Sequence, residues 1–197
     1  MAYSDFNLRS VERIFGLEIE ERQSLFTDLA PLMVPEALQL ALSKWAPIAL
    51  STNTEKARSE MIIAPILMTV CELSPTPLGL FSGVTFDVDS ERGLTGVCDY
   101  LLSQSEDIYF PASPIISVVE AKKENIPSGL GQCLAEMIAA QEFNLREGKE
   151  LEMLYGVVTT GSNWRFLKLS GHNAWIDFPE YTLSELGKIL AILLSGL

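Results

Sequence analysis

Two acids and one lysine stand where apolar stretches of the sequence end. Asp99 follows residues 94–98, and Glu120 follows the apolar, β-branched run 115–119. Lys122 comes two residues after Glu120, and side chains two apart on a strand point to the same face. Because isolated buried charge is costly, a largely apolar strand that carries both residues needs a reason.

Two interpretations of this grouping are open. In the first, Glu120 and Lys122 form an ion pair at the wet end of a strand. In the second, Asp99, Glu120 and the carbonyl oxygen of Ala121 hold a divalent cation, Mg²⁺ or Mn²⁺, and Lys122 orients or deprotonates the attacking water. We favour the second for the three side chains taken together, since both acids end strands.

The Glu-x-Lys spacing alone is weak, because it occurs twice. Glu147-Gly148-Lys149 also fits, but it lies in a polar connection without a preceding apolar run, which is typical of a solvated surface. Other chemistry finds little support in the sequence. There is no phosphate-binding loop and no nucleophile elbow. The only histidine, His172, stands in a Gly-His-Asn turn, and Gly129-Leu130-Gly131 lacks the third glycine of a dinucleotide fingerprint, which favours a flexible start of a helix.

The hydrophobic pattern predicts one α/β domain with a mixed sheet flanked by helices. A helical N-terminal extension would cover residues 1–54, the core 55–170, and a C-terminal turn and helix 171–197. The predicted helices are 8–50, interrupted by Pro31 and Pro35, then 55–71, 130–146 and 182–197, and the predicted strands are 78–89, 94–103, 114–122, 151–160 and 164–169.

This order of elements, with Asp99 and Glu120-Ala121-Lys122, resembles the PD-(D/E)XK nuclease superfamily, which has the restriction-endonuclease-like fold. The resemblance runs from about Lys56 to Leu169. It implies a metal-dependent nuclease that cleaves DNA with Mg²⁺ or Mn²⁺. The acidic residue on the family's first helix matches Glu60, which would be an outer or second-metal ligand. A glutamine of some branches matches Gln132, which we expect in the first turn of its helix, bonded to the site or to the DNA backbone.

The charge of the chain bears on its partners. The net charge is −12, and the isoelectric point is about 4.5. Because affinity for nucleic acid depends largely on neutralising phosphates, this argues against a surface built for polyanions. Weak DNA binding, help from a partner, or an oligomeric cleft, as in a homodimer, would each accommodate the charge. The same charge favours the alternative function, a catalytically inactive interaction module of this fold.

Three features of the sequence bear on where in the cell the protein is found. No apolar run approaches the roughly 20 residues of a membrane helix, and the first residues lack the basic and apolar regions of a signal peptide. Three separated cysteines form no CxxC pair, which suits a reducing compartment. We therefore predict a cytoplasmic protein without a membrane partner.

Overall fold

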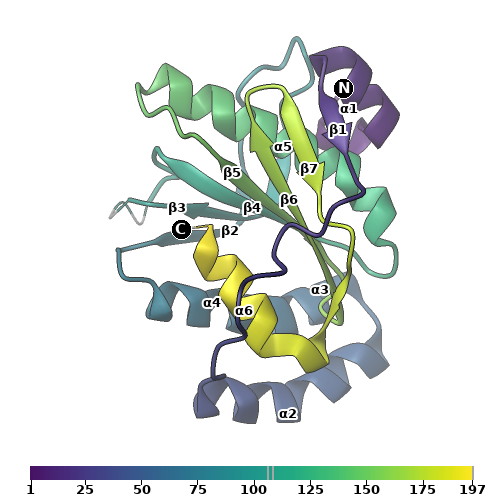
Figure 1. Ribbon diagram of the computed structural model, residues 1–197, viewed down its shortest axis with the longest axis vertical. Helices are drawn as coiled ribbons and strands as arrows, with labels where there is room; N and C mark the ends of the chain where they lie inside the picture. Colours follow the sequence, from purple (N-terminus) through teal and green to yellow (C-terminus); the bar gives the residue numbers. More distant parts are fainter. Residues whose placement is uncertain (106, 108, 197) are drawn as a thin grey trace.

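The computed structural model describes residues 1–105, 107 and 109–196 (Figure 1). Its strands are β1 (Glu18–Glu20), β2 (Gly79–Thr85), β3 (Val97–Ser103), β4 (Ile115–Ala121), β5 (Leu154–Thr159), β6 (Asn163–Ser170), β7 (Asn173–Ile176) and β8 (Tyr181–Thr182). Its helices are η1 (Tyr3–Asp5), α1 (Leu8–Phe15), α2 (Glu36–Thr52), α3 (Glu55–Arg58), the π-helical turn η2 (Ser59–Ile63), α4 (Ala64–Leu73), α5 (Ile126–Arg146), η3 (Leu183–Glu185) and α6 (Leu186–Ser195).

The strands of the described residues form one mixed sheet. Its order is β1-β7-β6-β5-β4-β3-β2, and β8 pairs with β6. Strands β2, β3 and β4 are antiparallel neighbours, whereas β4 and β5 are parallel and are connected by α5. A parallel pair needs such a crossover, because the chain has to return to the opposite end of the sheet before the second strand can begin. The predicted α/β fold with a mixed sheet flanked by helices is therefore confirmed.

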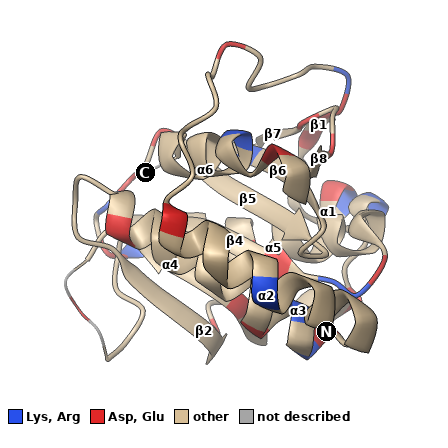
Figure 2. Ribbon diagram, turned by 90° about the horizontal axis from the view of Figure 1, so that it is seen from below, with Lys and Arg blue, Asp and Glu red and all other residues tan. Residues whose placement is uncertain are grey.

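Helices cover both faces of the sheet (Figures 1 and 2). Helices α1 and α5 lie on one face, and α2, α3, α4 and α6 lie on the other. Strand β4 is buried along its whole length between these layers, as its apolar sequence predicts for a central strand. Its alternate residues serve the two cores, since Val118 belongs to the cluster under α5 and Val119 to the cluster under α4 and α6.

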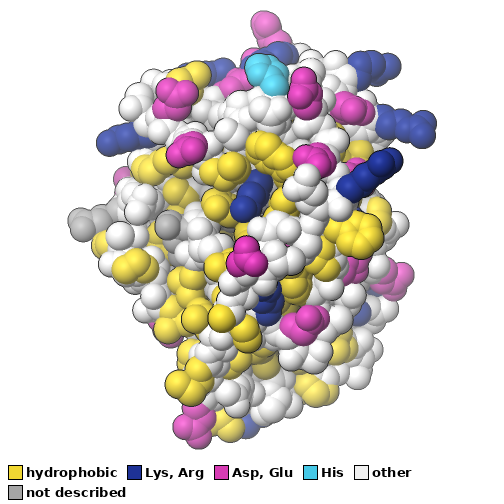
Figure 3. All heavy atoms as spheres, in the orientation of Figure 1, with side chains coloured by type: hydrophobic (Ala, Val, Ile, Leu, Met, Phe, Trp, Pro, Cys, Tyr) yellow, Lys and Arg dark blue, Asp and Glu magenta, His cyan; other side chains and the backbone are white. Residues whose placement is uncertain are grey.

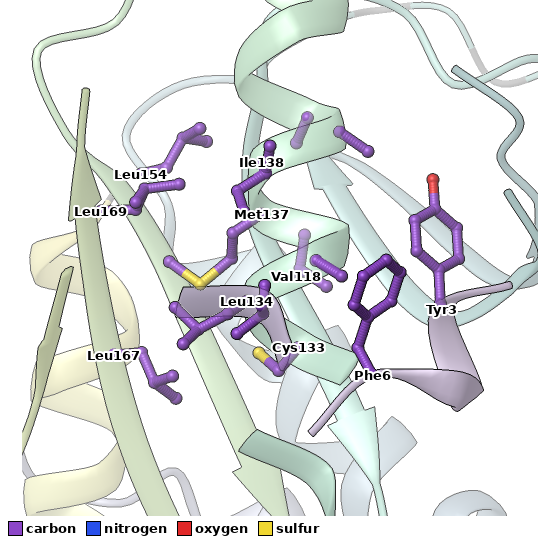
Figure 4. Close-up of a cluster of buried hydrophobic side chains, with 14 of the residues drawn as sticks. Tyr3, Phe6, Val118, Cys133, Leu134, Met137, Ile138, Leu154, Leu167 and Leu169 are labelled. Atoms are coloured by element: carbon purple, nitrogen blue, oxygen red, sulfur yellow. The ribbon is translucent and has the colours of Figure 1, made fainter. Parts of the chain in front are cut away.

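The N-terminal segment adds to the α5 side of the core. Tyr3 and Phe6 pack beside α5 (Figure 4), and the Tyr3 hydroxyl donates a 2.7 Å hydrogen bond to the carbonyl oxygen of Phe86. Gly131 lets the start of α1 approach, because a Cβ there would lie 2.4 Å from Cα of Asn7. The interpretation of the Gly129–Gly131 string as a flexible helix start is thus wrong, since these glycines lie inside α5 at close contacts.

Several predicted boundaries are also wrong. The helices expected over 8–50 are α1 and α2, and α2 begins directly after the predicted break at Pro35. The stretch between them is not helical, because Gly16 ends α1 in the left-handed conformation and β1 follows. The helix expected over 55–71 is divided by η2 and runs on to residue 73. Strand β3 begins only at residue 97, and α5 begins four residues before the predicted start. Strands β1, β7 and β8 were not predicted, and Leu197 of the last predicted helix lies outside the described residues.

The helices of the structure are short or carry charged and polar side chains. Within the described part of the chain, no helix combines the length and the apolar character needed to cross a bilayer.

Candidate active site

Asp99 and Glu120 meet where β3 begins and β4 ends. Glu120 is the last residue but one of β4, as expected, but Asp99 is the third residue of β3 and does not end a strand, because β3 runs on to Ser103. Tyr100 of β3 pairs with Val119 of β4, and continuing this antiparallel register by one residue places Asp99 opposite Glu120. Asp99 also caps the neighbouring backbone, because its Oδ2 accepts a 2.8 Å hydrogen bond from the amide nitrogen of Ala121. The structure thus brings together the two carboxylates that the sequence singled out.

Lys122 completes this group at the end of β4. Its Nζ lies 2.5 Å from Oε1 of Glu120 and donates a 3.1 Å hydrogen bond to Oε1 of Gln132. The lysine side chain is 22% exposed and that of Glu120 is 2% exposed, so the ammonium lies at the rim and the carboxylate beneath it. Gly129 makes room for the lysine stem, because a Cβ there would lie 3.1 Å from Cε of Lys122.

A third acid, Glu136, belongs to the same cluster. It is fully buried on α5, and its Oε1 accepts a 3.0 Å hydrogen bond from Nε2 of Gln132. Among the described residues, Oε2 of Glu120 and Oε2 of Glu136 are buried without a hydrogen-bond partner. Sequence reasoning missed Glu136. The available signal was its spacing of four residues from Gln132, which places both polar side chains on one face of a helix that is otherwise apolar there.

The acids compete for one positive charge. Burial, followed by the charge of Asp99, raises the pKa of Glu120 to about 7, and Lys122 only partly opposes this shift. Burial also raises the pKa of Asp99, and burial together with Glu120 raises that of Glu136 well above its usual range. Burial is the largest single influence on Lys122 and would lower its pKa, but the charge and hydrogen bond of Glu120, together with the charges of Glu55 and Asp99, outweigh burial and raise the pKa. Three carboxyl groups therefore share a single ammonium in a place that stabilises charge poorly.

Two residues of the predicted site lie elsewhere than expected. Glu60 is in η2, where its exposed carboxylate lies 2.8 Å from Nζ of Lys56, one helical turn earlier. The helix acid that acts on the site is Glu55 at the start of α3, whose charge contributes to the raised pKa values of both Asp99 and Lys122. Gln132 does contact Lys122, but in the second turn of α5, because this helix begins at Ile126.

The donor set suits a hard divalent cation. In the described ranges, no three or more His, Cys, Asp and Glu side chains are already arranged as a metal centre. Carboxylate oxygens are nevertheless the ligands that Mg²⁺ and Mn²⁺ prefer, and Oε2 of Glu120 has no partner although it is buried beside Asp99. Because Lys122 binds the other oxygen of Glu120, this Oε2 is the one that could contact a cation.

A scan against models of protein families finds no match to this chain, and a search of curated proteins finds no match either. Its function therefore has to be inferred from the geometry of the site.

Proposed function

We propose that this chain is a metal-dependent, nuclease-like protein with the restriction-endonuclease-like fold, which hydrolyses DNA phosphodiester bonds. The observation that carries the proposal is the excess of buried carboxyl groups beside a single ammonium, where β3 begins and β4 ends. A structural ion pair needs one acid for one base. Here three acids, Asp99, Glu120 and Glu136, lie near the one ammonium of Lys122 with raised pKa values, and a divalent cation would allow them to ionise together.

The ligands of that cation would be the carboxylates of Asp99 and Glu120 and the carbonyl oxygen of Ala121. A bound Mg²⁺ or Mn²⁺ ion would polarise the phosphoryl group and lower the pKa of a water ligand. The residues around it hold the arrangement in place. The amide of Gln132 accepts from Lys122 and donates to Glu136, so it fixes the ammonium on the same side as both acids.

Lys122 would act as a fixed positive charge. Its raised pKa keeps it protonated at neutral pH, so it cannot take a proton from water in this state. A protonated lysine at the rim can instead hydrogen-bond a water or a phosphate oxygen and stabilise the negative charge that develops in the transition state. Of the two roles expected for this residue, the structure therefore favours orientation and charge stabilisation over deprotonation.

A second function is favoured by a different observation. The 2.5 Å contact between Lys122 and Glu120 is also what a structural ion pair would show, and the net charge of −12 opposes DNA binding. These features favour a catalytically inactive interaction module with the same fold.

Replacing Lys122 with alanine separates the two functions. Because a protonated lysine cannot coordinate a cation and repels one, Lys122→Ala should keep or strengthen the affinity for Mg²⁺ and Mn²⁺. Cleavage should fall by roughly 100-fold or more, as loss of a group that stabilises the transition state does. Calorimetric titration and cleavage of single-stranded, duplex and branched DNA would be measured on the same preparations.

The chain supplies a matched control. Lys149 ends the second Glu-x-Lys string, which is exposed in the connection between α5 and β5, so Lys149→Ala should change neither affinity nor rate. A Lys122→Ala variant that cuts as fast as the wild type would refute the mechanism. A wild type that binds no divalent cation would leave the interaction module as the better account.

A further inference from the structure

Helix α2 presents an apolar face to solvent. Its inward residues are Leu38, Leu42, Ala46 and Ala49, which are buried against α3, η2 and α4. Its outward side chains include further large apolar ones: Leu40 is 55% exposed, and Trp45, Ile48 and Leu50 are exposed as well. Met33, just before the helix, is 91% exposed. Large apolar side chains exposed together on one side of a helix are suited to a partner, even where a few charged and polar ones stand between them, as on the outward side of α2.

The charges of α2 are few, and their positions are informative. Among its residues only Glu36 and Lys44 are charged, and Figure 2 shows one acidic and one basic segment along this helix. Both lie on the outward side, four residues before and four residues after Leu40, which is about 6 Å along the axis in each direction. Glu36, Leu40 and Lys44 therefore form one outward stripe with opposite charges at equal distances from its centre.

We propose that α2 pairs with α2 of a second copy of this chain, antiparallel about a two-fold axis at Leu40. In this arrangement Glu36 of each copy faces Lys44 of the other, and the two Leu40 side chains meet between these pairs. A parallel arrangement would instead place like charges together. The symmetry of the stripe about Leu40 thus matches a two-fold interface, in which the same patch serves both copies.

The charge of the rest of the molecule also favours this face. Two copies that each carry a net charge of −12 repel one another over most of their surfaces. The stripe on α2 is neutral in sum, so two copies that meet through it bring no additional like charges into contact. Figure 3 shows hydrophobic side chains spread over the middle and lower part of the molecule, toward the end where α2 lies in Figure 1. Because one helix pair is a small interface, we expect a dissociation constant on the order of 10 µM.

Substitutions that reverse the charges of Glu36 and Lys44 test the proposed dimer independently of nuclease activity. Sedimentation velocity from about 1 to 200 µM should show a monomer–dimer equilibrium for the wild type. Glu36→Lys or Lys44→Glu alone creates two like-charge contacts and should weaken the dimer by about tenfold or more. The double variant restores both pairs and should restore the affinity. All these positions are exposed, and circular dichroism would verify that each variant is folded.

Controls with the same change in net charge are available far from α2. Glu147→Lys and Lys149→Glu, which are exposed after α5, should leave the dimer unchanged apart from general repulsion. A wild type that stays monomeric at 200 µM would overturn the proposal. A dimer whose affinity does not change with Glu36→Lys or Lys44→Glu would also overturn it, because the interface would then lie elsewhere. A double variant that dimerises as weakly as the single variants would overturn it too.

Discussion

Replacing Glu120 with glutamine should stabilise the protein at alkaline pH and leave its stability nearly unchanged at acidic pH. Glutamine resembles the protonated carboxyl group, and burial together with Asp99 raises the pKa of Glu120 from its ordinary 4.5 to about 7. A carboxyl group with a raised pKa binds its proton more tightly in the folded protein than in the unfolded one. The free energy of unfolding of the wild type therefore falls as the pH rises between these two values.

The size of this effect follows from the shift in pKa. One pKa unit corresponds to about 1.36 kcal/mol, so the shift from 4.5 to about 7 amounts to about 3 kcal/mol. The side chain is almost fully buried, so solvent screens the effect little. By pH 8 the wild type should have lost about 3 kcal/mol of stability that Glu120→Gln retains.

Urea denaturation at intervals from pH 4.5 to 8.5, in the presence of a chelator, measures the difference between the two proteins. Glu60→Gln is the matched control, because Glu60 is exposed and its ion pair is with the exposed Lys56, one turn earlier. Its difference from the wild type should stay small throughout. If the contact with Lys122 mainly stabilises the fold, Glu120→Gln would instead become less stable than the wild type as the pH rises. That opposite sign would refute the reasoning. Added Mg²⁺ should narrow the gap at pH 8, since it would stabilise the wild type.

Three further changes have definite expected results. Gly129→Ala places a Cβ 2.7 Å from Cγ1 of Val158, so denaturation should show a loss of about 1–3 kcal/mol, and unchanged stability would mean that α5 can shift freely. Asn144→Ala removes the side chain that both accepts from the amide and donates to the carbonyl of Ile115. It should cost about 2–3 kcal/mol in the same measurement because buried backbone groups lose their partners, and a loss below 0.5 kcal/mol would contradict this. Glu136→Gln should remain folded and weaken Mn²⁺ binding by about tenfold or more in calorimetry, whereas unchanged affinity would exclude Glu136 from the site.

Strand β4 and its charged end could be predicted from the sequence, because an apolar run that ends in Glu120 and Lys122 is best explained as a buried strand. A β-branched apolar run is typical of a strand covered on both faces, and β4 is buried along its whole length. Side chains two apart then have to share a face, which is how Glu120 and Lys122 come to touch. The position of Asp99 opposite Glu120 also required that β3 and β4 be antiparallel neighbours in the register that pairs Tyr100 with Val119.

The parts of the fold and of the site that were not predicted depend on contacts between residues far apart in the sequence, which a local pattern does not encode. Glu18-Ile19-Glu20 becomes a strand only because β7 offers a free edge, and both pieces are too short to show a period. Glu136 was hidden because a carboxyl group inside an apolar helix face is recognised as part of a site only once its neighbours on the sheet are known. Glu55 and Glu60 both open the same predicted helix, and only the folded structure shows that the charge of Glu55, which lies in α3 before the π-helical turn, acts on Asp99.

The parallel pairing of β1 with β7 affects how the chain is made. Residues of β1 leave the ribosome long before those of β7, so this piece of sheet has no partner during most of synthesis. Unpaired strand edges are sites at which nascent chains aggregate. Glu18 and Glu20 flank Ile19 with negative charge and stay exposed in the finished fold. They therefore protect the emerging segment from pairing with another chain until its own partner has been synthesised.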